Sequence, residues 1–168
     1  MKQMLKKMKF VLLAVISVLS LVFGVGCGSG GSSDSADNEN ESLNTFYETV
    51  VSSQTCLDIV ADDIYRNWYD AIYKDKYSGS IDLAIAYALS TNSDNLATIE
   101  ANEPIIHSAY KSVRDSKLSA EVKAVMNVYS DYYEFVVNVS GSFNTFSASK
   151  ETLKKELASA LKKLALEM

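Results

Sequence analysis

Apolar residues recur at steps of three and four positions over most of the chain beyond residue 42. The most regular run extends over 118–146, and its steps alternate between four and three without interruption. Such a stripe is typical of a helix with one buried face. We therefore predict a helix here, although the β-branched run Val136–Val137 would also suit a short strand. The stripe consists of Leu118, Val122, Val125, Tyr129, Tyr132, Val136, Val139, Phe143 and Phe146.

Two further stripes predict a first and a last helix. The first helix has Ser42 as a candidate N-cap and is ended by the flexible run 78–80. The last helix covers about 150–167, with Ser149 as its candidate N-cap. The inward stripe of the first helix is Leu43, Phe46, Val50, Ser53, Leu57, Val60, Ile64, Trp68 and Ile72, and that of the last is Leu153, Leu157, Leu161 and Leu164. Lys154, Lys155, Lys162 and Lys163 are predicted to lie on the solvent face of the last helix.

The segment 81–115 keeps the same spacing but carries two interruptions. Residues 91–95 are all polar, and Pro104 removes a backbone hydrogen bond from any helix that contains it. We predict one helical arm that is broken or kinked near 91–95, near 102–104, or at both places. In the second case Asn102 or Glu103 could cap a new segment that starts at Pro104.

The joints predicted between these helices, near 77–80, 115–117 and 147–149, are short. Short joints make successive helices antiparallel. The predicted fold of residues 43–168 is therefore all-α, an antiparallel up-down-up-down four-helix bundle with a broken or kinked second helix.

The first 26 residues have the pattern of a secretory signal. Four lysines without an acid occupy residues 1–9, and an apolar run over 10–23 leads to small residues around Gly26. The apolar run has 14 residues, whereas a membrane-spanning helix needs about 20. A removable signal is therefore favoured over a permanent transmembrane helix.

The end of this segment resembles the lipobox of bacterial lipoproteins, in which a small residue is followed directly by cysteine. Gly26 precedes Cys27 here, and Gly24 stands where the family most often has Leu. The resemblance covers residues 1–27. It implies a diacylglyceryl group on the Cys27 thiol, cleavage between Gly26 and Cys27, and attachment to the extracytoplasmic face of a cell membrane. An ordinary secretory signal with an incidental cysteine is the alternative.

The residues that follow Cys27 are predicted to form a tether. Residues 28–42 pass from a Gly/Ser tract into an acidic one and contain no large apolar side chain, so 27–42 is assigned to a lipidated cysteine and a disordered linker. The chain carries a net charge of -5. Four of its positive charges are the lysines of residues 1–9, so the chain beyond this segment is more acidic than the total suggests. An acidic chain repels phosphate backbones, so nucleic acid is excluded as an expected partner.

No arrangement of residues typical of an enzyme or a metal site is present. Cys56 lies at the edge of the first apolar stripe and is predicted to be a small buried hydrophobe, and the only histidine, His107, follows Glu103 by four positions. The first helix also carries a set of acidic residues that we interpret as its solvated face: Asp58, Asp62, Asp63 and Asp70. We expect no catalytic residues, no metal ligands and no cofactor.

Tyrosine is the most unusual feature of the composition, with 10 residues and a single tryptophan. Tyr and Trp are enriched at contact surfaces, but they also build wide cores with hydroxyls at the rim. The candidate binding residues are Tyr65, Arg66, Trp68, Tyr69, Tyr73, Tyr129 and Tyr133. The predicted function is a non-enzymatic lipoprotein that binds a protein partner or ligand through this face. The alternatives are an envelope-protection lipoprotein (immunity or phage exclusion) or an assembly lipoprotein, and a helical bundle that binds a small ligand or cofactor.

Overall fold

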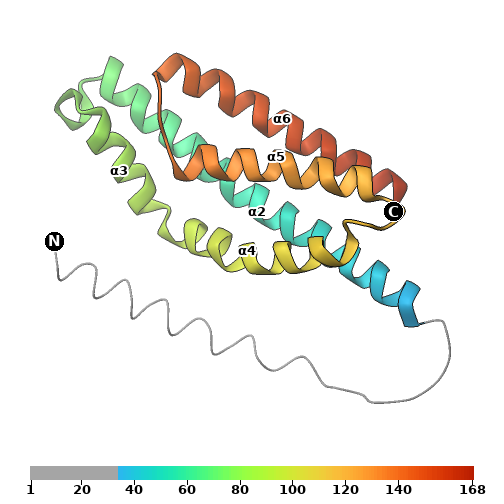
Figure 1. The fold of residues 1–168 in the computed structure, drawn as a ribbon. Helices are drawn as coiled ribbons and strands as arrows, with labels where there is room; N and C mark the ends of the chain where they lie inside the picture. Colours follow the sequence, from blue (N-terminus) through green and yellow to red (C-terminus); the bar gives the residue numbers. More distant parts are fainter. Residues whose placement is uncertain (1–33) are drawn as a thin grey trace. The chain divides into compact units, whose positions relative to one another are not determined.

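The structure is a computed structural model that describes the backbone from Asp34 and the side chains from Asn38 to Met168. The predictions for the signal segment and for Cys27 lie outside the described residues. Over 34–168 the chain is all-helical, which confirms the predicted fold class, but it has five α-helices instead of four (Figure 1). These elements are α2 (Asp34–Tyr73), the short 3₁₀ helix η1 (Lys76–Gly79), α3 (Ile81–Thr91), α4 (Ser93–Val113), α5 (Ser119–Val137) and α6 (Phe143–Glu167).

Helix α2 lies at the centre of the domain and packs against every other α-helix. Its inward stripe, which includes Phe46, Leu57 and Ile64, is fully buried as predicted, with the exception of its last residue, Ile72. Burial of these side chains from water supplies the main favourable term for the fold. The buried face of α2 therefore contributes to the core that all the other α-helices help to form.

Neighbouring helices run in opposite directions. Asn92 at the start of α4 bonds to Asp63, and the Tyr110 ring near its end contacts the Phe46 ring, so α4 is antiparallel to α2. Helix α6 likewise begins with Phe143 beside Tyr73, and it places Lys154 near Asp58. Pairs of this kind fix the register of each helix on α2.

Helix α2 begins earlier than the sequence predicts. Residues 34–42, which we assigned to the disordered linker, form its first two and a half turns. Glu39 and Glu41 in this part are exposed. Glutamate is a good helix former. A helix that is already anchored by Leu43 and Phe46 can therefore extend beyond its core without further apolar residues.

The second predicted arm is broken at one place only. Asn92 ends α3 and begins α4, which confirms the break predicted within 91–95, while α4 continues through Pro104. Asn102 and Glu103 do not cap a new segment there. Their side chains bind Ser53 and Tyr129 on neighbouring helices instead.

The last joint lies at 138–142, not at the predicted 147–149. Helix α5 ends at Val137, and α6 begins at Phe143 with Ser142 and Thr145 forming a capping box. Gly141 has a φ of 88°, a left-handed conformation that suits glycine. The spacing of apolar residues gave no sign of this turn because Phe143 faces the core from its new helix as Val139 does from the turn.

None of the helices in the described part of the chain combines the length and the apolar character that a membrane span requires.

Candidate functional site

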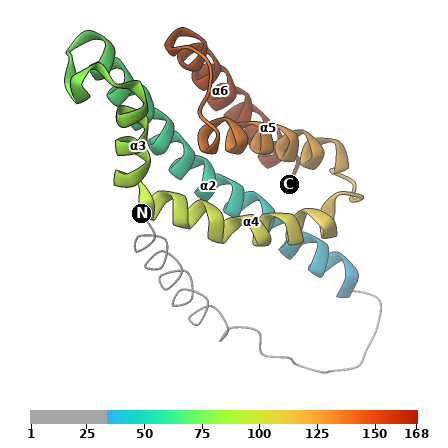
Figure 2. The same cartoon turned by 60° about the vertical axis from the view of Figure 1, so that its left-hand side comes forward.

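Most of the exposed large apolar side chains of the domain gather at one end. Of the nine such side chains in the described residues, six lie between residues 69 and 87, at the end of α2 and in the first two turns of α3. Figure 1 places this end opposite the C-terminus, and Figure 2 shows α3 beside the same end of α2. Exposed apolar side chains that are grouped in this way mark interaction sites more often than scattered ones do. We call the six residues the apolar tip: Tyr69, Ile72, Tyr73, Ile81, Leu83 and Tyr87.

Aromatic contacts hold the α2 side of the tip together. Tyr65, Tyr69 and Tyr73 follow one another at steps of four and all contact the ring of Phe143 on α6. The Tyr65 and Phe143 rings are stacked with centroids 5.1 Å apart, and the Tyr69 and Tyr73 centroids are 4.7 Å apart. Trp68 packs edge-on against Phe143 and is 3% exposed. Trp68 is thus part of the core, whereas Tyr69 and Tyr73 are 39% and 61% exposed.

A second aromatic pair lies on the α3 side. The Tyr77 and Tyr87 centroids are 5.4 Å apart, and the Lys76 ammonium lies 5.0 Å from the Tyr77 centroid. Asp70 connects the two sides, because it pairs with Lys76 and with Lys74 at 2.8 Å. The hydrogen bond from Lys74 is the main reason that the pKa of Asp70 is lowered. Both lysines at the tip therefore pair with one carboxylate, which offsets one of their two positive charges.

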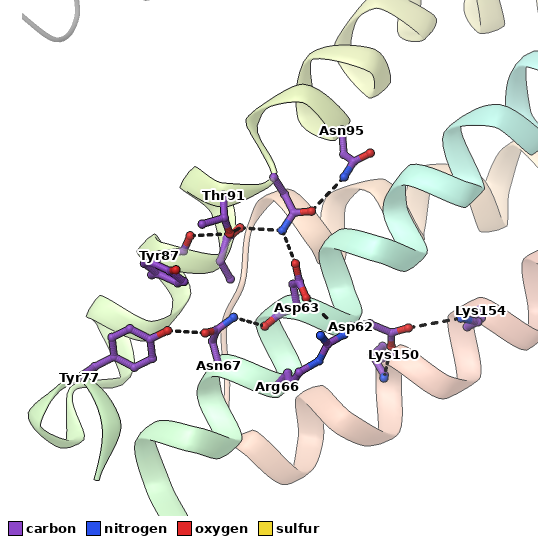
Figure 3. Close-up of polar contacts among 12 residues, drawn as sticks. Asp62, Asp63, Arg66, Asn67, Tyr77, Tyr87, Thr91, Asn95, Lys150 and Lys154 are labelled. Carbon is purple, nitrogen blue, oxygen red and sulfur yellow. Dashed lines mark hydrogen bonds and ion pairs between the residues drawn. The ribbon is translucent and has the colours of Figure 1, made fainter. Parts of the chain in front are cut away.

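The turn between α2 and α3 contains residues in an unfavourable backbone conformation. Asp75, Tyr77 and Ser78 have φ values of 51°, 59° and 53°. For residues other than glycine this left-handed conformation costs about 1–2 kcal/mol each. The Tyr77 hydroxyl donates a hydrogen bond to Asn67 of α2, which fixes the turn (Figure 3). Backbone strain of this kind concentrates at functional sites, which supports the tip as one.

Three of the seven predicted binding residues lie away from the tip aromatics. Arg66 extends into solvent, with its side chain 71% exposed, and pairs with Asp63 at 3.3 Å. Tyr129 and Tyr133 are neighbours on α5, and the Tyr129 hydroxyl donates to Glu103 of α4. Burial, and then the bond to Glu103, raise the pKa of Tyr129. Tyr129 therefore belongs to the contact between α4 and α5.

The acidic residues of α2 are not the solvated face that we predicted. The Lys150 ammonium lies 2.5 Å from Asp62, and the Lys154 ammonium lies 3.7 Å from the same carboxylate (Figure 3). Lys154 also lies 3.3 Å from Asp58. The Tyr132 hydroxyl donates to Asp58 at 2.8 Å. These contacts join α2 to α5 and α6. They also correct the prediction that Lys154 faces only solvent.

A polar cluster on the side of α2 that faces α3 and α4 fixes the joint between these two helices. The buried Asn92 amide donates to Asp63 at 2.8 Å and to the Ala88 carbonyl at 2.9 Å (Figure 3). Asn95 donates to the Asn92 side-chain oxygen at 2.9 Å. Because buried polar groups are costly to leave unpaired, this cluster favours one position of α3 on α2.

The other titratable candidates take structural roles. Cys56 is half-buried against the core, and burial raises the pKa of its thiol. His107 lies 3.4 Å from Glu103 on the same face of α4. Within residues 38–168 no group of three or more His, Cys, Asp and Glu side chains is arranged to hold a metal ion. What the tip itself offers is apolar and aromatic contact.

Four of the six tip residues, Ile72, Ile81, Leu83 and Tyr87, were not among the predicted binding residues. Ile72 was assigned to the inward stripe, but it is 42% exposed because α5 stops short of it. Tyr132 of α5 is hydrogen-bonded to Asp58 of α2, which gives a common reference level for the two helices. From that level α5 continues for five residues, or about 7.5 Å, before it ends at Val137. Ile72 lies 14 residues, or about 21 Å, farther along α2 than Asp58 and so beyond the end of α5. Ile81 and Leu83 could have been found from the run 81–89, in which every residue except Asp82 is apolar.

Comparisons with protein-family models, with curated proteins and with solved structures find no match for this chain, so the function proposed below depends on its own residues.

Proposed function

We propose that this chain is a non-enzymatic lipoprotein that binds a protein partner through its apolar tip. In this proposal Cys27 becomes the first mature residue, carries the diacylglyceryl anchor and holds the domain on the extracytoplasmic face of a cell membrane. The observation that carries the binding role is the gathering of six exposed apolar side chains at one end of the domain. The proposal of an anchor rests on the resemblance of Gly26 and Cys27 to a lipobox.

The tip can supply a useful share of a binding energy. Complete burial of a large apolar side chain contributes about 1.5–3 kcal/mol. The six residues are 38–61% exposed, so covering them would gain about 1 kcal/mol each, or about 6 kcal/mol together. Association has its own entropic cost. A partner must therefore add polar or charged contacts around the tip.

We also propose that α3 and α4 act as one broken arm, so that the domain is an up-down-up-down four-helix bundle. The antiparallel pairs described above support this arrangement, as does the contact between Glu121 of α5 and Lys163 of α6. The bundle would position the tip at the C-terminal end of α2.

Photo-crosslinking in cells tests the binding role. A benzophenone amino acid replaces Tyr73 or Tyr87 in the full-length chain, and the matched control replaces Lys155, an exposed residue of α6. We expect one discrete adduct from both tip positions and none from position 155. Equal adducts from all three positions, or none from the tip in a normally displayed protein, would contradict the proposal.

The anchor has a separate test. Cells that are fed an alkyne analogue of palmitate should label the wild-type chain but not Cys27→Ala. The variant should also leave the membrane fraction. Equal labelling of the two proteins would show that the lipid is attached elsewhere and would remove Cys27 from the proposal.

A further inference from the structure

We propose that the partner presents an amphipathic helix whose apolar face is flanked by lysine or arginine, and that this helix lies against the outer face of α3. The inference rests on the proposed function and adds the chemistry of the partner to it. Three observations support it: the incomplete covering of α3, the shape of its outer face and the distribution of charge along the α3–α4 arm.

Helix α3 combines a very apolar sequence with little covering. Among the described elements it packs only against α2, η1 and α4. Its buried residues are Ala84 and Ala88, whereas Leu83 and Tyr87 are 59% and 50% exposed. A helix that is apolar on all sides is normally covered by other elements. The outer face of α3 is therefore suited to a further contact.

The outer face has a shape that fits a second helix. Leu83 and Tyr87 are four positions apart, so they form one ridge along α3. Ala86 and Ser90, also exposed and four positions apart, form a lower row beside it. Helices pack by placing such ridges into the grooves of a neighbour at interaxial distances of 8–10 Å. A partner helix can therefore place its own apolar ridge in the groove above Ala86 and Ser90, beside the ridge of Leu83 and Tyr87.

Charge determines which kind of helix fits. The segment 77–110 contains no Lys or Arg, but it contains Asp82, Asp94, Glu100 and Glu103. Asp82, Asp94 and Glu100 are exposed and form no ion pair with any described residue. The two lysines at the tip are already paired with Asp70. A basic helix would gain attraction along this arm, whereas an acidic helix or an anionic lipid surface would be repelled.

A pair of matched peptides tests the inference on the full-length chain held in lipid nanodiscs. Both peptides have the same apolar helical face and no tryptophan, and their flanking positions carry either lysine or glutamate. Binding is measured by the fluorescence anisotropy of the labelled peptide. We expect the lysine peptide to bind at least about tenfold more tightly, with a difference that shrinks as salt is raised.

Variants of the protein locate the contact. Leu83→Ser should weaken binding of the lysine peptide at least about tenfold, and Ala86→Arg should do so without touching any buried residue. The matched control is Leu166→Ser, because Leu166 is 76% exposed near the end of α6, and it should have no effect. Circular dichroism checks that each variant keeps its helices. If Leu83→Ser does not fold, Ala86→Arg alone decides the location.

Each other outcome overturns a different part. Equal affinity for both peptides would refute the proposed preference for a basic helix, although an apolar helix could still bind to α3. Binding of neither peptide, together with persistent adducts from Tyr87 in cells, would refute the basic helix but not the proposed function. Preferential binding of added phosphatidylglycerol vesicles to the nanodiscs would identify a lipid surface instead. A dimer that is lost in Leu83→Ser would identify a second copy of this chain.

Discussion

The contact between Asp62 and Lys150 leads to an asymmetric prediction. Lys150 is buried, and its ammonium lies 2.5 Å from Asp62, 3.2 Å from Glu151 and 4.6 Å from the centre of the Tyr65 ring. Burial lowers the pKa of Lys150, but the hydrogen bonds to Asp62 and Glu151 outweigh this effect, and the pKa is raised. Asp62 itself is 41% exposed. Loss of the partner charge should therefore cost more free energy for the buried Lys150 than for the partly exposed Asp62.

The magnitudes follow from that difference. Breaking a fully buried pair costs about 3–5 kcal/mol, and breaking an exposed pair costs about 0.2–1 kcal/mol. Asp62→Asn leaves a buried ammonium without its nearest carboxylate, and we expect it to cost about 2 kcal/mol. Lys150→Met keeps most of the apolar stem and lets Asp62 return to water. Its expected cost is about 0.5 kcal/mol, so the two changes differ by about 1.5 kcal/mol.

Urea unfolding of the detergent-solubilised full chain, followed by circular dichroism, measures both free energies of unfolding. Lys155→Met is the matched control, because Lys155 is an exposed neighbour on α6. The control should leave the free energy of unfolding unchanged. If Lys150→Met costs as much as Asp62→Asn or more, the reasoning from unequal burial is wrong.

Three further predictions follow from the polar contacts and the turns. Burial, and then hydrogen bonds to carboxylates, raise the pKa of Tyr129 and of Tyr132 above the ordinary 10.0, so the stability from their neutral hydroxyls is present below pH 10 and is lost above it. Between pH 9 and 11 the free energy of unfolding should fall by about 1.4 kcal/mol for each of the two tyrosines, and Tyr132→Phe should make the fall shallower. Equal falls for the wild type and the variant in urea titrations over this range would contradict this. Gly141→Ala should cost about 2 kcal/mol in urea unfolding, because φ is 88° and the new Cβ would lie 2.9 Å from the Thr145 hydroxyl; a cost below about 0.5 kcal/mol would refute the strain. Asn92→Ala should speed amide hydrogen exchange in α3 more than in α4, and equal protection of both helices would show that the side chain does not hold the joint.

The helical character of the chain could be predicted because it depends on local periodicity. The buried stripe of α2 and the break at Asn92 follow from apolar spacing and from a polar run. The turn at 138–142 could not be placed in the same way. Val139 and Phe143 keep the spacing of one helix although they belong to a turn and to the next helix, and Gly141 was the local signal for the turn.

The candidate site was predictable only within one helix. Tyr65, Tyr69 and Tyr73 are grouped because they are four positions apart on α2. Their contact with Phe143 depends on how α6 folds back, and the hydrogen bond from Tyr129 to Glu103 likewise joins two separate helices. Pairs between distant segments require the tertiary structure.

The length of α2 has a consequence for where the tip can work. At 1.5 Å per residue, the 40 residues from Asp34 to Tyr73 extend over about 60 Å. If Cys27 carries the proposed anchor, the tip is confined to a layer above the membrane whose depth is set mainly by this one helix. Confinement of this kind raises the effective concentration of the tip for anything held in the same layer. A weak contact at α3 could then be well occupied in the cell, although it would dissociate readily once the anchor is removed.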